Sequence, residues 1–201
     1  MVILMNMPGG RDKHAWRAEI LTRRSAVPAE ERARDAAGLA ETVAGLDVPE
    51  WVCAYVPVGS EPGSIAMLDA LRAGGARVLL PLTGGKEPLD WAEYTGERDL
   101  RPAKYGLREP AGPRLGSDAV GKAGLILIPA LAVDRRGVRL GRGAGHYDRT
   151  LGAARPDALL VAVVRDDELV ESLPEEPHDL RMGWALTPRG GLRRLGGRPA
   201  E

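Results

Sequence analysis

The sequence lacks phenylalanine altogether and contains one cysteine and three histidines among its 201 residues. A core without Phe has to be built from Leu, Val and Ala together with the few Trp and Tyr residues, so truncating any of these is expected to be costly. Because Cys53 is the single cysteine, the chain cannot form an internal disulfide, and its apolar neighbours predict a buried, unreactive thiol. The scattered histidines provide no zinc-binding spacing.

Neither sign of charge is in excess, since 28 Lys and Arg residues balance 28 Asp and Glu residues. No overall field therefore favours nucleic acid or an anionic membrane surface. No segment approaches the ~20 apolar residues of a membrane span, and the apolar start at residues 1–5 is far too short for a signal peptide. We expect a cytoplasmic protein, a monomer or weak homo-oligomer, that binds small molecules and neither nucleic acid nor membrane.

The length fits one domain, 1–201, in which helix and strand patterns alternate. Helices are expected from Asp12 to about Ala26, from Pro28 to near Gly45, and after a cap at Ser64. Strands are expected in apolar runs at 51–57, 78–80, 89–92, 125–128, 159–164 and 184–187. This order predicts an α/β fold with an open, largely parallel twisted sheet flanked by helices.

Three further segments differ in character. Residues 97–122 are rich in glycine, proline and charge, which predicts a long irregular connection. The segment around Asp134 predicts a short antiparallel hairpin, and the ends, 1–11 and 190–201, are expected to be flexible. Because ligands of open α/β sheets bind beyond the carboxyl ends of strands, the loops near residue 60, near residue 81 and after the hairpin are expected to converge on one cleft.

The most informative stretch runs from residue 139 to residue 149 and reads RLGRGAGHYDR. Its alternate glycines can adopt positive φ and turn consecutive backbone N–H groups toward an anion, and a helix beginning near His146 would point its free N–H groups at the same spot. Arg142 could clamp the anion, and Asp148 could hold a magnesium ion directly or through water. The stretch predicts a phosphate-binding loop; the alternative is a tight strand-to-helix loop without a ligand.

Residues 128–151 as a whole, including the preceding strand and its proline, resemble the signature of the 5-formyltetrahydrofolate cyclo-ligases, also called methenyltetrahydrofolate synthetases. Matching positions extend in the expected order from Lys13 to Thr187. Three residues depart from the family pattern: Ala130 replaces a glycine, Val133 a phenylalanine, and His146 the first of two tyrosines. The resemblance implies the same α/β fold and a cleft that holds ATP next to a reduced folate.

By this resemblance, the protein is an ATP-dependent ligase that converts 5-formyltetrahydrofolate to 5,10-methenyltetrahydrofolate, with Mg²⁺ as its metal and ATP as co-substrate. The implied nucleotide-binding residues lie in the first helix and the glycine-rich loop: Lys13, Arg17, Arg139, Gly141, Arg142, Gly143, Ala144, Gly145, His146, Tyr147 and Asp148. Arg142 and Lys13 are the expected catalytic residues, and Asp148 is the expected metal ligand. Arg24 could extend the basic patch, although Lys13 and Arg17 at this spacing also suit a solvated helix face.

The implied folate-binding residues are aromatic or acidic: Tyr55, Glu61, Tyr105, Glu109, His146 and Tyr147. A carboxylate such as Glu61 can accept from the adjacent N–H donors of a pterin ring, whereas the alternative is a solvated turn glutamate. Glu109 could orient a ligand or simply stand in a turn fixed by Pro110. Asp179, in a late Pro-x-Glu-x-His-Asp-like element, could support the metal region or cap a turn.

Two other functions remain open at the level of sequence. One is a folate- or nucleotide-binding protein of the same fold with lost or altered activity, which the departures at Ala144 and His146 within the loop make conceivable. The other is a kinase-like or isomerase-like enzyme that acts on a different phosphorylated metabolite. ADP production during turnover of a reduced folate distinguishes the cyclo-ligase from both.

Overall fold

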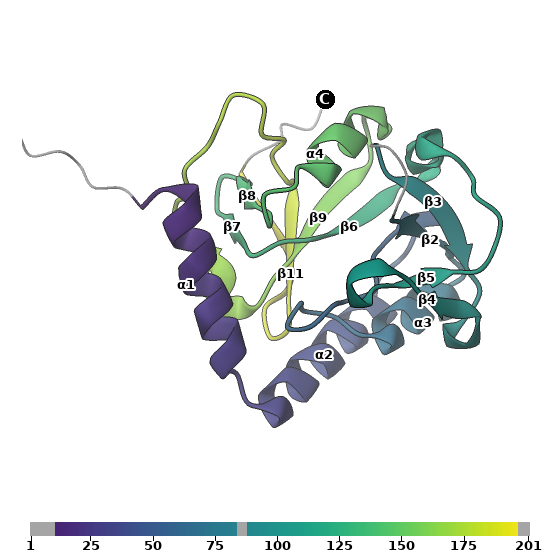
Figure 1. The fold of residues 1–201 in the computed structure, drawn as a ribbon, viewed down its shortest axis with the longest axis horizontal. Helices are drawn as coiled ribbons and strands as arrows, with labels where there is room; N and C mark the ends of the chain where they lie inside the picture. Colours follow the sequence, from purple (N-terminus) through teal and green to yellow (C-terminus); the bar gives the residue numbers. More distant parts are fainter. Residues whose placement is uncertain (1–10, 84–87, 197–201) are drawn as a thin grey trace, which may run out of the picture.

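The computed structural model describes residues 11–83 and 88–196, apart from the side chain of Tyr105. A seven-stranded sheet with the order β12-β11-β9-β6-β1-β2-β3 forms its centre (Figure 1). The strands are β1 Trp51–Cys53, β2 Arg77–Leu82, β3 Asp90–Tyr94, β6 Leu125–Pro129, β9 Leu159–Val163, β11 Trp184–Thr187 and β12 Gly191–Arg194. Strands β11, β9, β6, β1 and β2 pair in parallel, and only the edge strands β3 and β12 are antiparallel. The expected largely parallel sheet is confirmed.

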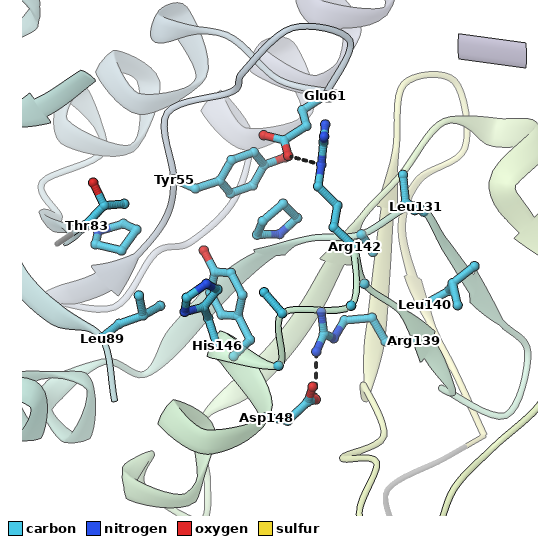
Figure 2. A pocket seen from close by; sticks show the side chains of 18 of the residues that line it. Tyr55, Glu61, Thr83, Leu89, Leu131, Arg139, Leu140, Arg142, His146 and Asp148 are labelled. Atoms are coloured by element: carbon cyan, nitrogen blue, oxygen red, sulfur yellow. Dashed lines mark hydrogen bonds and ion pairs between the residues drawn. The ribbon is translucent and has the colours of Figure 1, made fainter. Parts of the chain in front are cut away.

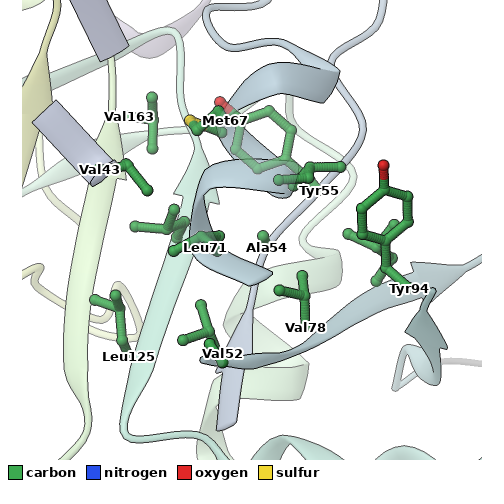
Figure 3. Close-up of a cluster of buried hydrophobic side chains, with 14 of the residues drawn as sticks. Val43, Val52, Ala54, Tyr55, Met67, Leu71, Val78, Tyr94, Leu125 and Val163 are labelled. Carbon is green, nitrogen blue, oxygen red and sulfur yellow. The ribbon is translucent and has the colours of Figure 1, made fainter. Parts of the chain in front are cut away.

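Two helices, α2 (Ala29–Ala44) and α3 (Ile65–Ala73), cover one face of this sheet. Side chains alternate between the two faces along a strand, so β1 sends Val52 to this face and Cys53 to the other. Figure 3 shows Val43 of α2, Leu71 of α3 and Val52 of β1 in one cluster of buried side chains. Ser64 caps α3 as predicted, because its hydroxyl accepts a hydrogen bond from the Met67 N–H at 3.2 Å.

The opposite face is covered by the 3₁₀ helix η3 (Ser117–Lys122), the short helix α4 (His146–Thr150) and η4 (Leu151–Ala153). Cys53 lies fully buried in this second core cluster. Its burial raises the pKa of the thiol well above the ordinary value, so the prediction of an unreactive cysteine is confirmed.

Helix α1 (Lys13–Ala26) packs beside a small sheet with the order β10-β7-β8, formed by Leu169–Val170, Ala132–Asp134 and Arg139–Leu140. Asp12 caps the helix as predicted and accepts a hydrogen bond from the Ala15 N–H at 2.7 Å. Ile20 of α1 is buried against Leu140 and its neighbours. The antiparallel β7–β8 pair is the expected hairpin, and it delivers the glycine-rich loop to the carboxyl edge of the main sheet.

Two expectations are wrong in detail. The strand expected over 51–57 ends at Cys53, because the backbone beyond Ala54 leaves the neighbouring strands and no longer pairs with them. The segment 97–122 is not irregular: it contains η1 (Glu97–Asp99), η2 (Lys104–Gly106) and the antiparallel pair of β4 (Leu100–Pro102) with β5 (Arg108–Pro110). These short strands carry prolines and charges that their sequence alone does not mark as a hairpin.

The chain ends differ from expectation as well. Residues 191–194, expected to be flexible, form β12, which pairs with β11 at the edge of the main sheet. Residues 1–10 and 197–201 lie outside the described part of the chain, while Arg11 forms an ion pair with Glu19. In the described ranges, no helix is long and apolar enough to cross a membrane.

Candidate active site

A cavity of about 520 Å³ opens at the carboxyl ends of β1, β2 and β6. Its walls come from α1, from the loop after β1, from the segment after β2 and from the loop between β8 and α4. Figure 2 shows Glu61, Thr83, Arg142 and His146 around a common space, although they come from distant parts of the chain. The three loops therefore converge as predicted, and the cavity has the size of a small-molecule site.

The glycine-rich loop has the backbone conformation that its sequence predicted. Gly143 and Gly145 adopt φ angles of 104° and 70°, in the left-handed region that favours glycine. A Cβ atom at Gly143 would lie 3.5 Å from the guanidinium carbon of Arg17, in ordinary van der Waals contact, so the positive φ rather than lack of space favours glycine there. Helix α4 does begin at His146, but it has only 5 residues. The loop amides, rather than a long helix dipole, must therefore supply most donors for an anion.

Both predicted cations of α1 reach the cavity. Arg17 donates from Nε to the Gly141 carbonyl oxygen at 3.0 Å and thereby holds the glycine-rich loop against the helix. Lys13 donates from Nζ to Glu176 at 2.8 Å and to Asp179 at 2.7 Å. Burial lowers the pKa of Lys13, but the hydrogen bonds and charges of the two carboxylates outweigh burial and raise it above the ordinary value. Lys13 is thus held by carboxylates at the rim of the site.

Asp148, the predicted metal ligand, accepts a hydrogen bond from Nη2 of Arg139 at 2.7 Å. The Arg139 guanidinium also lies 5.8 Å from the centre of the Tyr147 ring. Its Nε has no hydrogen-bond partner among the described residues, and its side chain is 6% exposed. These two predicted nucleotide-binding residues are therefore linked to each other, and Asp148 neutralises an almost buried cation.

Glu61, predicted for folate, and Arg142, predicted for phosphate, form an ion pair across the cavity. Nε of Arg142 donates to Oε1 of Glu61 at 3.0 Å, as drawn in Figure 2. The other carboxylate oxygen accepts from the Val58 N–H at 3.0 Å, which fixes the glutamate within its own loop. The side chain of Glu61 is only 14% exposed, whereas that of Arg142 is 52% exposed. Arg142 is thus the more exposed partner of a positioned carboxylate.

Two tyrosines predicted for folate binding contribute phenol groups to the cavity wall. The Tyr55 hydroxyl donates to the Pro62 carbonyl oxygen at 2.6 Å. Burial raises the pKa of Tyr55 and of Tyr147 above the ordinary value, and the negative charge of Glu61 adds to this shift in both residues. Both phenols are therefore neutral at physiological pH and can act as hydrogen-bonding groups or ring surfaces toward a ligand.

The remaining predicted residues divide into three cases. Glu109, on β5, lines the cavity and accepts hydrogen bonds from the backbone N–H and hydroxyl of Thr83. His146 and Ala144 also line the cavity. Tyr105 belongs to η2, and its side chain lies outside the described part of the structure.

Arg24 lines the cavity together with Lys13 and Arg17, so it extends the row of cations along α1, but it is not an exposed cation. Its side chain is buried and forms a bidentate ion pair with Glu168. Sequence reasoning also missed Thr83 and Leu89, which carry no motif, as part of the cavity wall. Glu176 was missed as well, although it stands two residues before His178 in the late element that contains Asp179.

Glu176, His178 and Asp179 form a group whose possible ligand atoms lie within 4.8 Å of one another. The group borders the cavity, and Lys13 is bound to both of its carboxylates. Asp179 also accepts a hydrogen bond from the Glu176 N–H at 2.8 Å. It therefore caps a turn, which was the alternative role considered for it. Asp179 therefore both lines the cavity and caps a turn.

Residues 10–188 match the model of the 5-formyltetrahydrofolate cyclo-ligase family. The chain is 50% identical over 188 residues to the 5-formyltetrahydrofolate cyclo-ligase of Mycolicibacterium smegmatis, a match that covers 90% of this chain and 96% of that protein. Its fold resembles the solution structure of Aquifex aeolicus 5,10-methenyltetrahydrofolate synthetase, with a TM-score of 0.75, 26% identity and coverage of 94% and 96% of the two chains. It also resembles the Mycoplasma pneumoniae synthetase, with a TM-score of 0.69, 17% identity and coverage of 87% and 98%. The chain therefore belongs to the 5-formyltetrahydrofolate cyclo-ligase family.

Proposed function

We propose that this protein is an ATP-dependent ligase that converts 5-formyltetrahydrofolate to 5,10-methenyltetrahydrofolate and releases ADP and phosphate. One observation carries this proposal: the glycine-rich loop and the Glu61 loop face the same cavity and meet at the Arg142–Glu61 contact of 3.0 Å. A group suited to phosphate and a group suited to a pterin are thereby close enough for their ligands to react. Membership of the family and the 50% identity to a named cyclo-ligase support the same conclusion.

In the proposed reaction, the formyl oxygen attacks the γ-phosphorus of ATP, and the bond from that phosphorus to the bridging oxygen breaks to release ADP. The neighbouring ring-closing nitrogen then attacks the formyl carbon and loses its proton to water, and the carbon–oxygen bond breaks to release phosphate. An amide-like oxygen is a poor leaving group until it is phosphorylated. Phosphoryl transfer chiefly requires alignment and neutralisation of charge, which the loop amides, Arg142, Lys13 and Arg17 are placed to provide.

Folate recognition is assigned to the side of the cavity that contains Glu61 and the two buried phenols. The Val58 N–H holds the Glu61 carboxylate in place, so the carboxylate can present two oxygens to the adjacent N–H donors of a pterin. Tyr55, Tyr147 and His146 would form the surface beside the ring, and Glu109 would also contact the folate. Tyr105 stays a predicted folate-binding residue by resemblance to the family. Arg142 has to leave Glu61 when both substrates bind.

The carboxylates at the cavity fit a hard divalent cation such as Mg²⁺, which prefers oxygen ligands. Asp148 would hold the ion, and Asp179 and Glu176 offer further oxygens that Lys13 occupies in this structure. When bound, the ion would neutralise phosphate charge during the transfer. Asp148 is also the partner of Arg139, so binding of the ion would have to compete with that ion pair.

The proposal is tested by following the absorbance of 5,10-methenyltetrahydrofolate with purified protein and 5-formyltetrahydrofolate, with and without ATP and Mg²⁺. We expect product only when both are present, together with one ADP for each folate converted. Saturable folate binding without ADP production would instead favour a binding protein of the same fold.

We also propose that the protein is cytoplasmic, that it is a monomer or a weak homo-oligomer, and that residues 1–201 form a single domain. Sedimentation of the purified protein tests its oligomeric state.

A further inference from the structure

Arg24 is the third cation of α1 that lines the cavity, after Lys13 and Arg17. Spacings of four and seven residues place all three on one face of the helix. At 1.5 Å per residue, Arg24 lies roughly 10 Å farther along the axis than Arg17. Helix α1 therefore runs along the cavity from the phosphate side to a point near Ala130, just after the end of β6.

The contacts of Arg24 leave one nitrogen unused. Nε donates to Oε1 of Glu168 at 2.6 Å, and Nη2 donates to Oε2 of Glu168 and to the Ala130 carbonyl oxygen, both at 2.7 Å. Nη1 is buried and has no hydrogen-bond partner in the described part of the chain. The whole side chain is 1% exposed. A buried guanidinium with an unused donor is costly, and Arg24 lines a ligand cavity, so this nitrogen is a candidate for a ligand contact.

Glu168 is fully used in holding this arginine. Besides the two bonds from Arg24, its Oε2 accepts a hydrogen bond from the Arg165 N–H at 2.8 Å. The ion pair is therefore electrically balanced, and an uncharged acceptor suits Nη1 better than a second full negative charge would. A carbonyl oxygen has that chemistry, whereas a phosphate does not.

The position of Arg24 favours the folate over the nucleotide. Arg17 and Lys13, which precede it on α1, are the residues at the glycine-rich loop and the carboxylate rim. The positive charge of Arg24 instead lowers the pKa of Tyr55. Burial, chiefly, and the negative charge of Glu61 raise this pKa and outweigh the effect of Arg24. Arg24 thus lies in the electrostatic environment of the residues assigned to the folate.

We infer that Arg24 is a substrate-binding residue whose Nη1 donates a hydrogen bond to a carbonyl oxygen of bound folate, and that Glu168 positions it. This inference rests on the proposed function. Removing Arg24 alone would leave Glu168 buried without a partner, so the test uses two variants. Arg24→Met combined with Glu168→Leu removes both charges, and Arg24→Lys keeps a cation for Glu168 but has no Nη1.

For both variants, we expect the KM and Kd for 5-formyltetrahydrofolate to rise by roughly 10-fold or more, as for loss of a hydrogen bond from a charged donor. The KM for ATP should change by less than about 2-fold, because the nucleotide groups are untouched. Arg23→Met is the matched control, since Arg23 also has a buried, unpartnered Nε but does not line the cavity. Its folate and ATP constants should equal those of the wild type.

A folate analogue with an amino group in place of the ring oxo group identifies the acceptor. If the ring carbonyl is the acceptor, wild type should bind the analogue more weakly than the natural folate, whereas the variants should bind the two ligands equally. If the variants instead lose the same affinity for both ligands, the acceptor is the formyl or amide carbonyl, and the inference is supported as well. Unchanged folate binding in both variants, or equal increases in both KM values, overturns it. Calorimetric Kd values test it even if wild type shows no turnover, an outcome that would reject the proposed function alone.

Discussion

Oε1 of Glu61 accepts a hydrogen bond from Nε of Arg142 at 3.0 Å across the cavity. The two residues come from different loops, one between β1 and α3 and the other between β8 and α4. We assign Glu61 to folate and Arg142 to phosphate, so without ligands the two groups are paired with each other. A ligand for either one should release its partner for the second substrate.

We therefore expect ATP and folate to bind cooperatively. A nonhydrolysable ATP analogue should tighten folate binding by roughly 5-fold or more, because phosphate competes with Glu61 for Arg142. Glu61→Gln should weaken folate binding much more than ATP binding and should abolish the coupling. Calorimetric titrations of each ligand, alone and with the other bound, measure this directly. Equal folate affinity with and without the analogue in the wild type would show that the ion pair does not link the two sites.

Removal of the phosphate clamp should affect turnover rather than folding. Arg142→Ala should lower kcat by roughly 10²- to 10³-fold, by analogy with loss of an oxyanion donor. Asp148→Ala should be similarly impaired. Asp148→Asn keeps an acceptor for the nearly buried Arg139, but it should weaken Mg²⁺ binding and so raise the Mg²⁺ concentration needed for turnover. Circular dichroism should remain native for Arg142→Ala, whose side chain is half exposed. Turnover like that of the wild type in both Arg142→Ala and Asp148→Ala would remove the phosphate assignment.

Acid should weaken the link between Asp179 and Lys13. Burial raises the pKa of Asp179, but the hydrogen bonds from Lys13 and from the Glu176 N–H, together with nearby positive charge, outweigh burial, so the pKa lies below the ordinary value of 3.8. The folded state therefore binds fewer protons than the unfolded chain, and the stabilisation is complete above about pH 4 and lost as pH falls through the folded pKa. In urea unfolding, Asp179→Asn should be less stable than wild type at pH 6, with the difference shrinking toward pH 3. Asp157→Asn, which removes an exposed partner of Arg155, should show a smaller effect.

The turn between β7 and β8 depends on glycine at position 137. Gly137 has a φ of 89°, and a Cβ atom there would lie 2.2 Å from the Met182 carbonyl oxygen. Gly137→Ala should lower the free energy of unfolding by about 2 kcal/mol or more through strain and backbone displacement. Gly152→Ala, where a Cβ atom meets nothing within 4 Å, should change it by less than about 0.5 kcal/mol. Equal denaturation midpoints for the two variants would contradict this account of the turn.

Sequence patterns predicted most of the fold because the determining forces act locally. Asp12 and Ser64 cap their helices through their own side chains, and the aliphatic runs of β6 and β9 fit only strands covered on both faces. The pair of β4 with β5 was missed; β5 contacts β2 and β3 in the folded chain, and no local pattern encodes those contacts.

The sequence by itself determined the helices, the parallel sheet, the positive φ of the glycine-rich loop and the chemical groups that serve the cavity. Those properties follow from residue type, from the two periodicities and from neighbours a few positions away. Only the tertiary structure decided which charges neutralise one another: Lys13 with Asp179 across 166 positions, Arg24 with Glu168, and Arg142 with Glu61. Ion pairing depends on distance in space and on burial, and the folded chain sets both by bringing remote segments together at one edge of the sheet.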